Sequence, residues 1–478
     1  MTNPTGPHRE ALSSSVLPPA GAVFAALVLL GYWVGTGSWI LVAVATLAIA
    51  VALSAGGNQL LGFALLGVVS LFDEYAYGVI DPGSTFLLRR YYVPYTTLVA
   101  DEFLVYLMAA LLLVQVFRGR QLKSPGRVVS RGVCVLFAVY AFQVLRAISD
   151  GYGFWDIAQV QSGKYLLLLC IALPLFVQLL DSSRVRLWVL DLLYLFGGGR
   201  AIFALLRFFV GNGDPANAYR GQVAKVALWD SADHLLYTVL IVVALSALVQ
   251  GGLSGRRLVI WLCACVPAGL VVALSYRREG WLGLLMSVSL LGLITWSRGG
   301  KSILAGAGLA AFAGSVISYA RFSLGGNLFE RIFPDAVAGG GATRLTEGAF
   351  AWATISQQPL IGGGLLAERL GGVFFWTTQI VHSGALFVWM KMGIFGLTAL
   401  FVIILGAYGS GVRAAHHGGD ERYLAVALVS TLPFILLEMG FSTPLLQIRI
   451  TLIWALILAL MCVLGGQAGS REEAHVGL

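Results

Sequence analysis

The sequence predicts an all-α, polytopic membrane protein, and three observations support that prediction. Of the 478 residues, 58% are hydrophobic and only 11% are charged, whereas a soluble domain carries about 25% charged residues. The apolar residues form long uninterrupted runs, which excludes the apolar–polar alternation of an outer-membrane barrel. At about 20 residues for each spanning helix, they suffice for on the order of fourteen spans. A soluble enzyme, a disordered chain and a disulfide-rich secreted module are therefore excluded.

Fourteen apolar runs of spanning length follow one another along the chain. The first three runs and the one interrupted by the glycines at 197–199 are the weakest candidates. We therefore predict about 12–14 transmembrane helices in a single membrane domain, residues 19–465, between tails at 1–18 and 466–478. The runs begin near Ala20, Trp39, Leu60, Leu98, Gly132, Lys164, Leu187, Asp233, Leu258, Leu282, Ser302, Val381, Tyr423 and Arg449.

The basic residues predict the orientation, because Lys and Arg are enriched in short cytoplasmic loops. The connection at 118–131 is the most basic, so we place it in the cytoplasm. Alternation of the spans then puts both tails and four further basic connections on the same side. The longest connection, residues 321–380, falls on the extracytoplasmic side. The four cytoplasmic connections contain Arg184 and Arg186, Arg256 and Arg257, Arg298 and Lys301, and the stretch 413–422.

Arginine is also frequent on the predicted outer side, against this topological preference. We assign most of the net charge of +8 to loops that face anionic lipid headgroups, and not to nucleic-acid binding. Topology does not explain the arginines on the outer side, so we favour a functional explanation for them. They are Arg146, Arg220, Arg277, Arg278, Arg321, Arg331, Arg344 and Arg369.

A tight turn between two spans, residues 275–283, places Arg277 and Arg278 at the depth of the headgroups. Guanidinium groups bind phosphate bidentately and stay charged at any relevant pH. The sequence therefore marks this turn as a phosphate-binding candidate. The alternative is that both side chains extend to the interface and pair with Glu279.

The long loop contains a predicted short amphipathic helix that begins after Thr343 and ends at Pro359. Glycine triplets flank it on both sides, so we expect a hinged helix at the outer membrane surface. Arg344 near its N-terminus suits an anion, or forms a surface pair with Glu347. Apolar and small residues recur at spacings of four, three and four, at Leu345, Ala349, Trp352 and Ser356.

His382 lies where the long loop enters an apolar helix. Histidine accepts a proton near neutral pH, so this residue is a candidate general base; the alternative is a structural cap of the helix. His234 follows Asp230 and Asp233 at another helix entrance, where it fits a polar cap. The five cysteines show no metal-ligand spacing, so no metal or cofactor is expected.

These residues resemble motifs of the O-antigen ligase and polymerase family over roughly the C-terminal half of the chain. Its members share a Ser-Arg-Gly-x-Trp-Leu turn, an Arg-x-x-x-Trp segment followed by Pro-Leu-x-Gly-x-Gly, and a His-Asn pair before Gly-x-x-Gly-Leu. Ser383 stands where the family has Asn, Glu279 replaces a small residue, and the Arg–Trp gap is wider. The matching residues are Arg278, Trp281 and Leu282; Arg344, Trp352, Pro359, Leu360, Gly362 and Gly364; His382, Gly393, Gly396 and Leu397; and Arg220 in the preceding loop.

The resemblance implies a GT-C-like architecture and glycosyl transfer from an undecaprenyl-pyrophosphate-linked glycan, at the outer face of the bacterial cytoplasmic membrane. It implies an inverting, metal-independent reaction in which His382 takes the acceptor's proton. Arg220, Arg278 and Arg344, with Arg277 in addition, would stabilise the pyrophosphate leaving group. The expected partners are that donor, a glycan or lipid-linked acceptor and the bilayer, with a chain-length regulator as a further candidate.

Polymerase and ligase activities both fit this resemblance. We favour the polymerase slightly, because the His-Asn pair is incomplete; a ligase would transfer onto a lipid A core or another surface acceptor. A second enzymatic hypothesis uses the carboxylates at 73–74 or 101–102, near outer span ends. A flippase or ion-coupled transporter would instead predict charge near mid-membrane and symmetric broken helices.

Overall fold

The computed structural model is helical throughout its regular structure. It describes residues 100–117, 119, 121–153, 157, 161–209, 231–275, 278–308, 340–367, 381–417, 419–442 and 447–476, and five positions between 62 and 69. No strand occurs in these parts of the chain. The main α-helices are α4 (Ala100–Phe117), α5 (Arg127–Ser149), α7 (Gln161–Leu179), α8 (Ser183–Phe209), α9 (Ser231–Gln250), α10 (Gly255–Leu274), α11 (Arg278–Ile294), α15 (Gly340–Gln357), α16 (Gly384–His417), α17 (Arg422–Ser430), α18 (Leu432–Phe441) and α19 (Ile448–Val476). A short 3-10 helix, η2 (Trp296–Arg298), follows α11, and residues 300–308 are also helical.

Seven of the described segments are long and apolar enough to cross a membrane, and three more are apolar but shorter. These ten segments coincide with ten of the fourteen predicted runs. The other four runs, which begin near residues 20, 39, 60 and 302, lie largely or wholly outside the described residues. For the described part of the chain, the prediction of an all-α, multi-pass membrane protein is therefore confirmed. The seven are Arg127–Ser149, Ser183–Leu206, Ala232–Gln250, Gly255–Leu274, Gly384–His417, Arg422–Phe441 and Ile448–Ala468.

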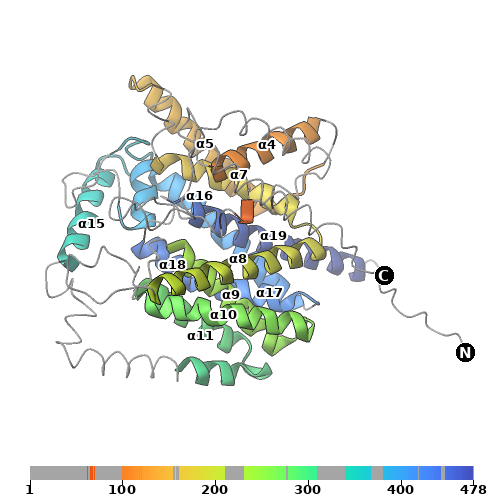
Figure 1. Cartoon of the computed structure of the whole chain (residues 1–478). Coiled ribbons are helices and arrows are strands. Elements are labelled where there is room, and N and C mark those ends of the chain that lie inside the picture. Colours follow the sequence, from red (N-terminus) through yellow and green to blue (C-terminus); the bar gives the residue numbers. More distant parts are fainter. Residues whose placement is uncertain are drawn as a thin grey trace, which may run out of the picture.

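Helix α19 forms the centre of the bundle. Figure 1 shows it running between α4, α5 and α7 on one side and α10 and α11 on the other. Its side chains from Ile448 to Leu464 are buried almost without exception. Helix α5, by contrast, buries one narrow stripe that includes Leu136 and Gln143, and Leu145 on another side is 67% exposed. An apolar helix with one buried stripe at the edge of a membrane bundle presents its other faces to lipid.

Helix α8 runs unbroken through the three glycines at 197–199, where the sequence suggests an interruption. The glycines allow close packing instead. A Cβ atom on Gly197 would come within 3.0 Å of Leu240 in α9, and one on Gly198 would touch Ala264 in α10. Small residues at helix contacts are the usual way in which membrane helices approach closely.

Helix α16 is kinked at Gly393, where the backbone has φ 68° and ψ −174°. Its 34 residues would extend roughly 51 Å as one straight helix, well beyond the ~30 Å apolar core of a bilayer. The kink separates a first segment, residues 384–392, from a second, residues 394–417. The second segment alone is long enough to span.

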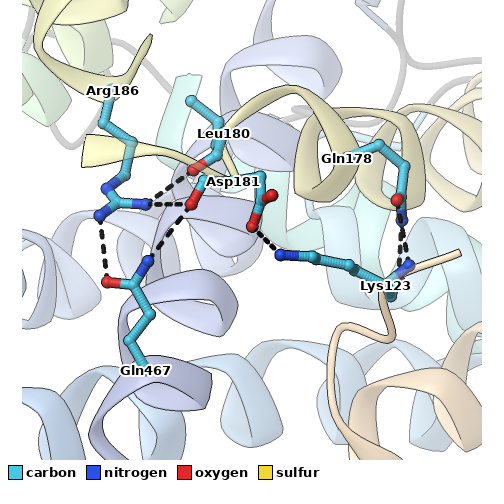
Figure 2. A network of polar contacts seen from close by, with 6 residues as sticks. All are labelled: Lys123, Gln178, Leu180, Asp181, Arg186 and Gln467. Carbon is cyan, nitrogen blue, oxygen red and sulfur yellow. Dashed lines mark hydrogen bonds and ion pairs between the residues drawn. The ribbon is translucent and has the colours of Figure 1, made fainter. Parts of the chain in front are cut away.

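One end of the bundle, which we call the basic end, gathers the connections predicted to be cytoplasmic. Arg186, 1% exposed, uses all five N–H donors: it binds both carboxylate oxygens of Glu421, the carbonyls of Leu180 and Asp181, and Gln467 Oε1. Figure 2 shows this network continuing from Asp181 to the ammonium of Lys123. The contacts tie the α7–α8 turn to the start of α17 and the end of α19.

Candidate functional site

The opposite end of the bundle, which we call the histidine end, carries the predicted site. His382 lies two residues before the start of α16 and is described in full. Arg278 is the first residue of α11 and Arg344 lies in the first turns of α15, but their side chains are outside the described part. Arg220 and Arg277 lie wholly outside the described residues. The structure therefore gives the surroundings of the histidine and the helical positions of two arginines.

His382 pairs with Glu347 of α15. Its ring nitrogen Nδ1 lies 3.0 Å from Glu347 Oε2 and 3.1 Å from Oε1, and its backbone N–H donates to Oε1 at 3.3 Å. The carboxylate is 2% exposed, whereas the imidazole is 36% exposed. A buried acceptor thus orients a histidine whose ring reaches the surface.

This arrangement selects one tautomer of His382. An ionised carboxylate accepts hydrogen bonds only, so Nδ1 carries the proton that faces Glu347. In the neutral imidazole Nε2 is then the nitrogen with the basic lone pair. A carboxylate that orients a histidine in this way is the arrangement found where histidine acts as a general base.

The N-cap of α16 is Ser383 and not His382, contrary to the alternative interpretation of the histidine. The Ser383 hydroxyl accepts from the backbone N–H of Leu386 and donates to the carbonyl of Met439, each at 3.4 Å. An N-cap side chain that accepts from the third helical residue is the usual capping geometry. The His382 side chain is therefore available for its pair with Glu347.

Helix α15 begins three residues before the predicted N-cap, at Gly340, and ends at Gln357. Its protein-facing side is not the predicted stripe: Ala349, Trp352 and Ser356 are exposed, while Glu347, Ala351 and Ile355 are buried. The buried residues recur every four positions, as expected for one helix face. Glu347 therefore lies on the buried face of α15 and not on its surface.

The Pro-Leu-x-Gly-x-Gly segment packs directly against the α16 kink. The backbone N–H groups of Gly363 and Gly364 donate to the carbonyls of Met390 and Lys391, at 2.8 and 3.2 Å. In return the N–H of Ile394 donates to the carbonyl of Pro359 at 3.0 Å. The two glycine motifs, more than twenty residues apart in the chain, therefore form one contact.

This contact requires glycine at two positions. Gly362 and Gly393 both have left-handed φ, 76° and 68°, which other residues rarely adopt. A Cβ atom on Gly393 would come within 3.0 Å of the Leu360 carbonyl oxygen, and one on Gly362 within 3.0 Å of the Gly393 nitrogen. Side chains at these positions would separate the loop from the kink.

A buried ionic cluster at the histidine end was not anticipated from the sequence. Asp233, fully buried, accepts from Nε and Nη2 of Arg200 and from Nη2 of Arg449, each at 2.8 Å. Arg449 also donates from Nε to the carbonyl of Val69, at 2.7 Å. The detectable signal was charge within apolar runs, which is costly in a membrane unless it is paired. The partner could not be read from the sequence, because it lies 216 residues away.

His234, expected as a simple polar cap, is fully buried against the start of α11. Its Nε2 lies 2.9 Å from the hydroxyl of Ser275, which donates to the carbonyl of Val272. A Cβ atom on Gly280 would come within 3.0 Å of the imidazole ring. Ser275 and Gly280, on either side of the connection that bears the two predicted phosphate-binding arginines, thus pack onto His234 of α9.

The carboxylates of the second enzymatic hypothesis are only partly described. Glu102 is 1% exposed and pairs with Lys164 Nζ at 2.8 Å, which is the arrangement of a buried structural ion pair. The side chain of Asp101 and both residues at 73–74 lie outside the described part. Within the described part, no group of three or more His, Cys, Asp or Glu side chains is arranged to hold a metal ion.

Comparison of the chain with protein-family models yields no match, and comparison with curated proteins yields none either.

Proposed function

We propose that this protein is an inverting glycosyltransferase of the bacterial cytoplasmic membrane that transfers or polymerises glycan from an undecaprenyl-pyrophosphate-linked donor at the outer face. The observation that carries the proposal is the pairing of His382 with the buried carboxylate of Glu347. This pair supplies an oriented base at the histidine end, where α11 with its predicted phosphate-binding Arg278 also begins. A slight preference for the polymerase follows from Ser383, which stands where the family's ligases carry Asn.

In the proposed reaction an acceptor sugar hydroxyl attacks the anomeric carbon of the donor. The new C–O bond forms as the bond to the pyrophosphate oxygen breaks, and the electron pair leaves with the pyrophosphate. The hydroxyl proton moves to Nε2 of His382, while Glu347 stabilises the resulting imidazolium. Attack from the face opposite the leaving group inverts the anomeric centre.

The pyrophosphate gains negative charge as it leaves, and positioned guanidinium groups stabilise such charge. Arg278 and Arg344 suit this role by position, since each lies in the first turns of its helix, where the helix dipole also favours an anion. Arg220 and Arg277 complete the proposed set. A ligase that uses the same donor is the alternative, and differs only in its acceptor.

The test is His382→Ala in the native host, with His416→Ala at the far, exposed end of α16 as the matched control. We expect about a 10²–10⁴-fold loss of transfer for the first and none for the second. Surface chains reduced to single repeat units would identify a polymerase. Long lipid-linked chains that accumulate without attachment would identify a ligase. Normal surface glycan in the His382→Ala strain would contradict the proposal and favour the transporter or the second enzymatic hypothesis.

A further inference from the structure

Helix α15, which bears Glu347, meets the segment formed by His382 and α16 at two places. The first is the carboxylate–imidazole pair itself. The second lies about ten residues further along both helices, where the loop after α15 contacts the α16 kink through three backbone hydrogen bonds. Figure 1 shows α15 at the edge of the bundle, beside α16. The position of the pair therefore depends on how this loop is held.

Helix α5 holds the loop from the other side. Gln143, fully buried, donates from Nε2 to the carbonyl of Ile361. Arg146 donates from Nη1 to the carbonyl of Gly362 at 2.8 Å and from Nη2 to Gln358 Oε1 at 2.7 Å. The two residues are three apart, so they lie on one face of α5. Both side chains end on the loop.

This contact assigns Arg146 a different role from that of the other outer arginines. Its guanidinium lies 3.9 Å from the carboxylate of Asp150 and is 22% exposed, but its two shortest contacts are with Gln358 and Gly362. The acceptors are a backbone carbonyl and a neutral amide, which a substrate anion would not replace. Charge-assisted hydrogen bonds of this kind are about twice as strong as neutral ones.

The geometry points to Arg146 and Gln143 as positioning residues for the Glu347–His382 pair. Removal of the Gln143 and Arg146 side chains takes one hydrogen-bond donor from each of the carbonyls of Ile361 and Gly362. The contact between the loop after α15 and the α16 kink is thereby weakened. The end of α15 can then move relative to α16, and Glu347 moves with it. A displacement of about 1 Å in a reacting group can cost 10²-fold in rate. The consequence for turnover rests on the proposed function, whereas the consequence for the pair does not.

The test compares Arg146→Ala and Gln143→Leu with Arg131→Ala, an exposed arginine at the other end of the same helix. The full-length protein is studied in lipid nanodiscs. We expect hydrogen exchange at the amides of Gly363 and Ile394 to rise about tenfold or more in the first two variants and to stay unchanged in the control.

Modification of His382 by diethyl pyrocarbonate reports on the pair without any substrate. Glu347→Gln defines the rate for an imidazole that has lost its carboxylate partner, and Arg146→Ala should shift the rate toward that value. Arg146→Lys, which keeps one charged donor, should restore it in part. In the transfer assay kcat should fall about 10–100-fold, with the KM for the lipid-linked donor unchanged.

Two results would overturn the inference: amide exchange equal to that of the Arg131→Ala control, or faster exchange with an unchanged modification rate at His382. Failure of the proposed function gives a different pattern. In that case His382→Ala retains transfer, while the exchange and modification rates of Arg146→Ala still respond as described.

Discussion

Replacement of Asp233 by Asn tests how strongly the buried ionic cluster supports the fold. Asp233 is fully buried, and its two arginine partners are at most 4% exposed. It accepts three hydrogen bonds of 2.8 Å, two of them from Arg200 in bidentate geometry. Asparagine keeps the shape but removes the charge and turns one acceptor atom into a donor, which faces another donor. Both guanidinium groups then lose this carboxylate as a counter-ion in a buried site.

Breaking a buried ion pair by removing one partner costs about 3–5 kcal/mol, and we expect Asp233→Asn to fall in that range. The matched control is Asp181→Asn at the basic end, where the pair with Lys123 is 47% and 60% exposed. Exposed pairs contribute about 0–1 kcal/mol. The free energy of unfolding is measured for both variants by denaturant titration in the same mixed micelles.

Equal losses of unfolding free energy in Asp233→Asn and Asp181→Asn would refute the reasoning that an ion pair costs more to break when it is buried. A triple variant, Asp233→Leu with Arg200→Met and Arg449→Met, separates charge from packing. Since apolar replacement of a whole buried cluster is often neutral, we expect the triple variant to be more stable than Asp233→Asn. The hydrogen bond from Arg449 to Val69 is lost in it, so recovery should be incomplete.

Four further substitutions test the helix packing and the Arg186 network. Gly197→Ala should cost about 1–3 kcal/mol by overpacking against α9. Gly199→Ala, where the new Cβ atom meets no atom within 4 Å, should be neutral or stabilise by up to about 1 kcal/mol. Thermal unfolding of the two variants measures the difference, and equal effects would contradict the packing role of Gly197. Gly393→Ala should cost about 3 kcal/mol or more, because the left-handed backbone and the loop carbonyl both exclude a Cβ atom. Proteolysis of the loop after α15 should increase, and a loop that stays intact would show that the kink tolerates a Cβ atom. Arg186→Ala should cost about 2 kcal/mol or more, because all five donors of the guanidinium are lost at once. An unfolding midpoint equal to wild type would show that this network does not stabilise the fold.

Much of the architecture was predictable, because the composition of each apolar run is enough to predict a membrane-spanning helix. A helix satisfies its backbone hydrogen bonds internally, so in lipid about 20 apolar residues predict a span without knowledge of any partner. Ten of the fourteen predicted runs are helices here. The interruption expected at 197–199 was wrong, because glycine in a membrane helix can serve close packing as well as a break.

The candidate site was predictable only in part. The position of His382 at a loop–helix junction suggested a base, but its partner Glu347 lies 35 residues away on a helix face that the spacing pattern assigned wrongly. Periodicity marks apolar residues, and a single carboxylate on the buried face of α15 does not appear as part of a stripe. The contacts of Gln143 and Arg146 with the loop after α15 could not be predicted for a second reason: two of the three acceptors are backbone carbonyls, which every residue carries.

The sequence by itself determined that this chain is helical, spans a membrane several times and carries a histidine and arginines at one end of its spans. Only the tertiary structure decided which charges meet: Asp233 with two arginines, His382 with Glu347, and Arg146 with a loop more than 200 residues away. The physical reason is that spanning depends on the composition of one segment. A buried charge, in contrast, is stabilised only by a specific partner, and helix packing determines which residue that partner is.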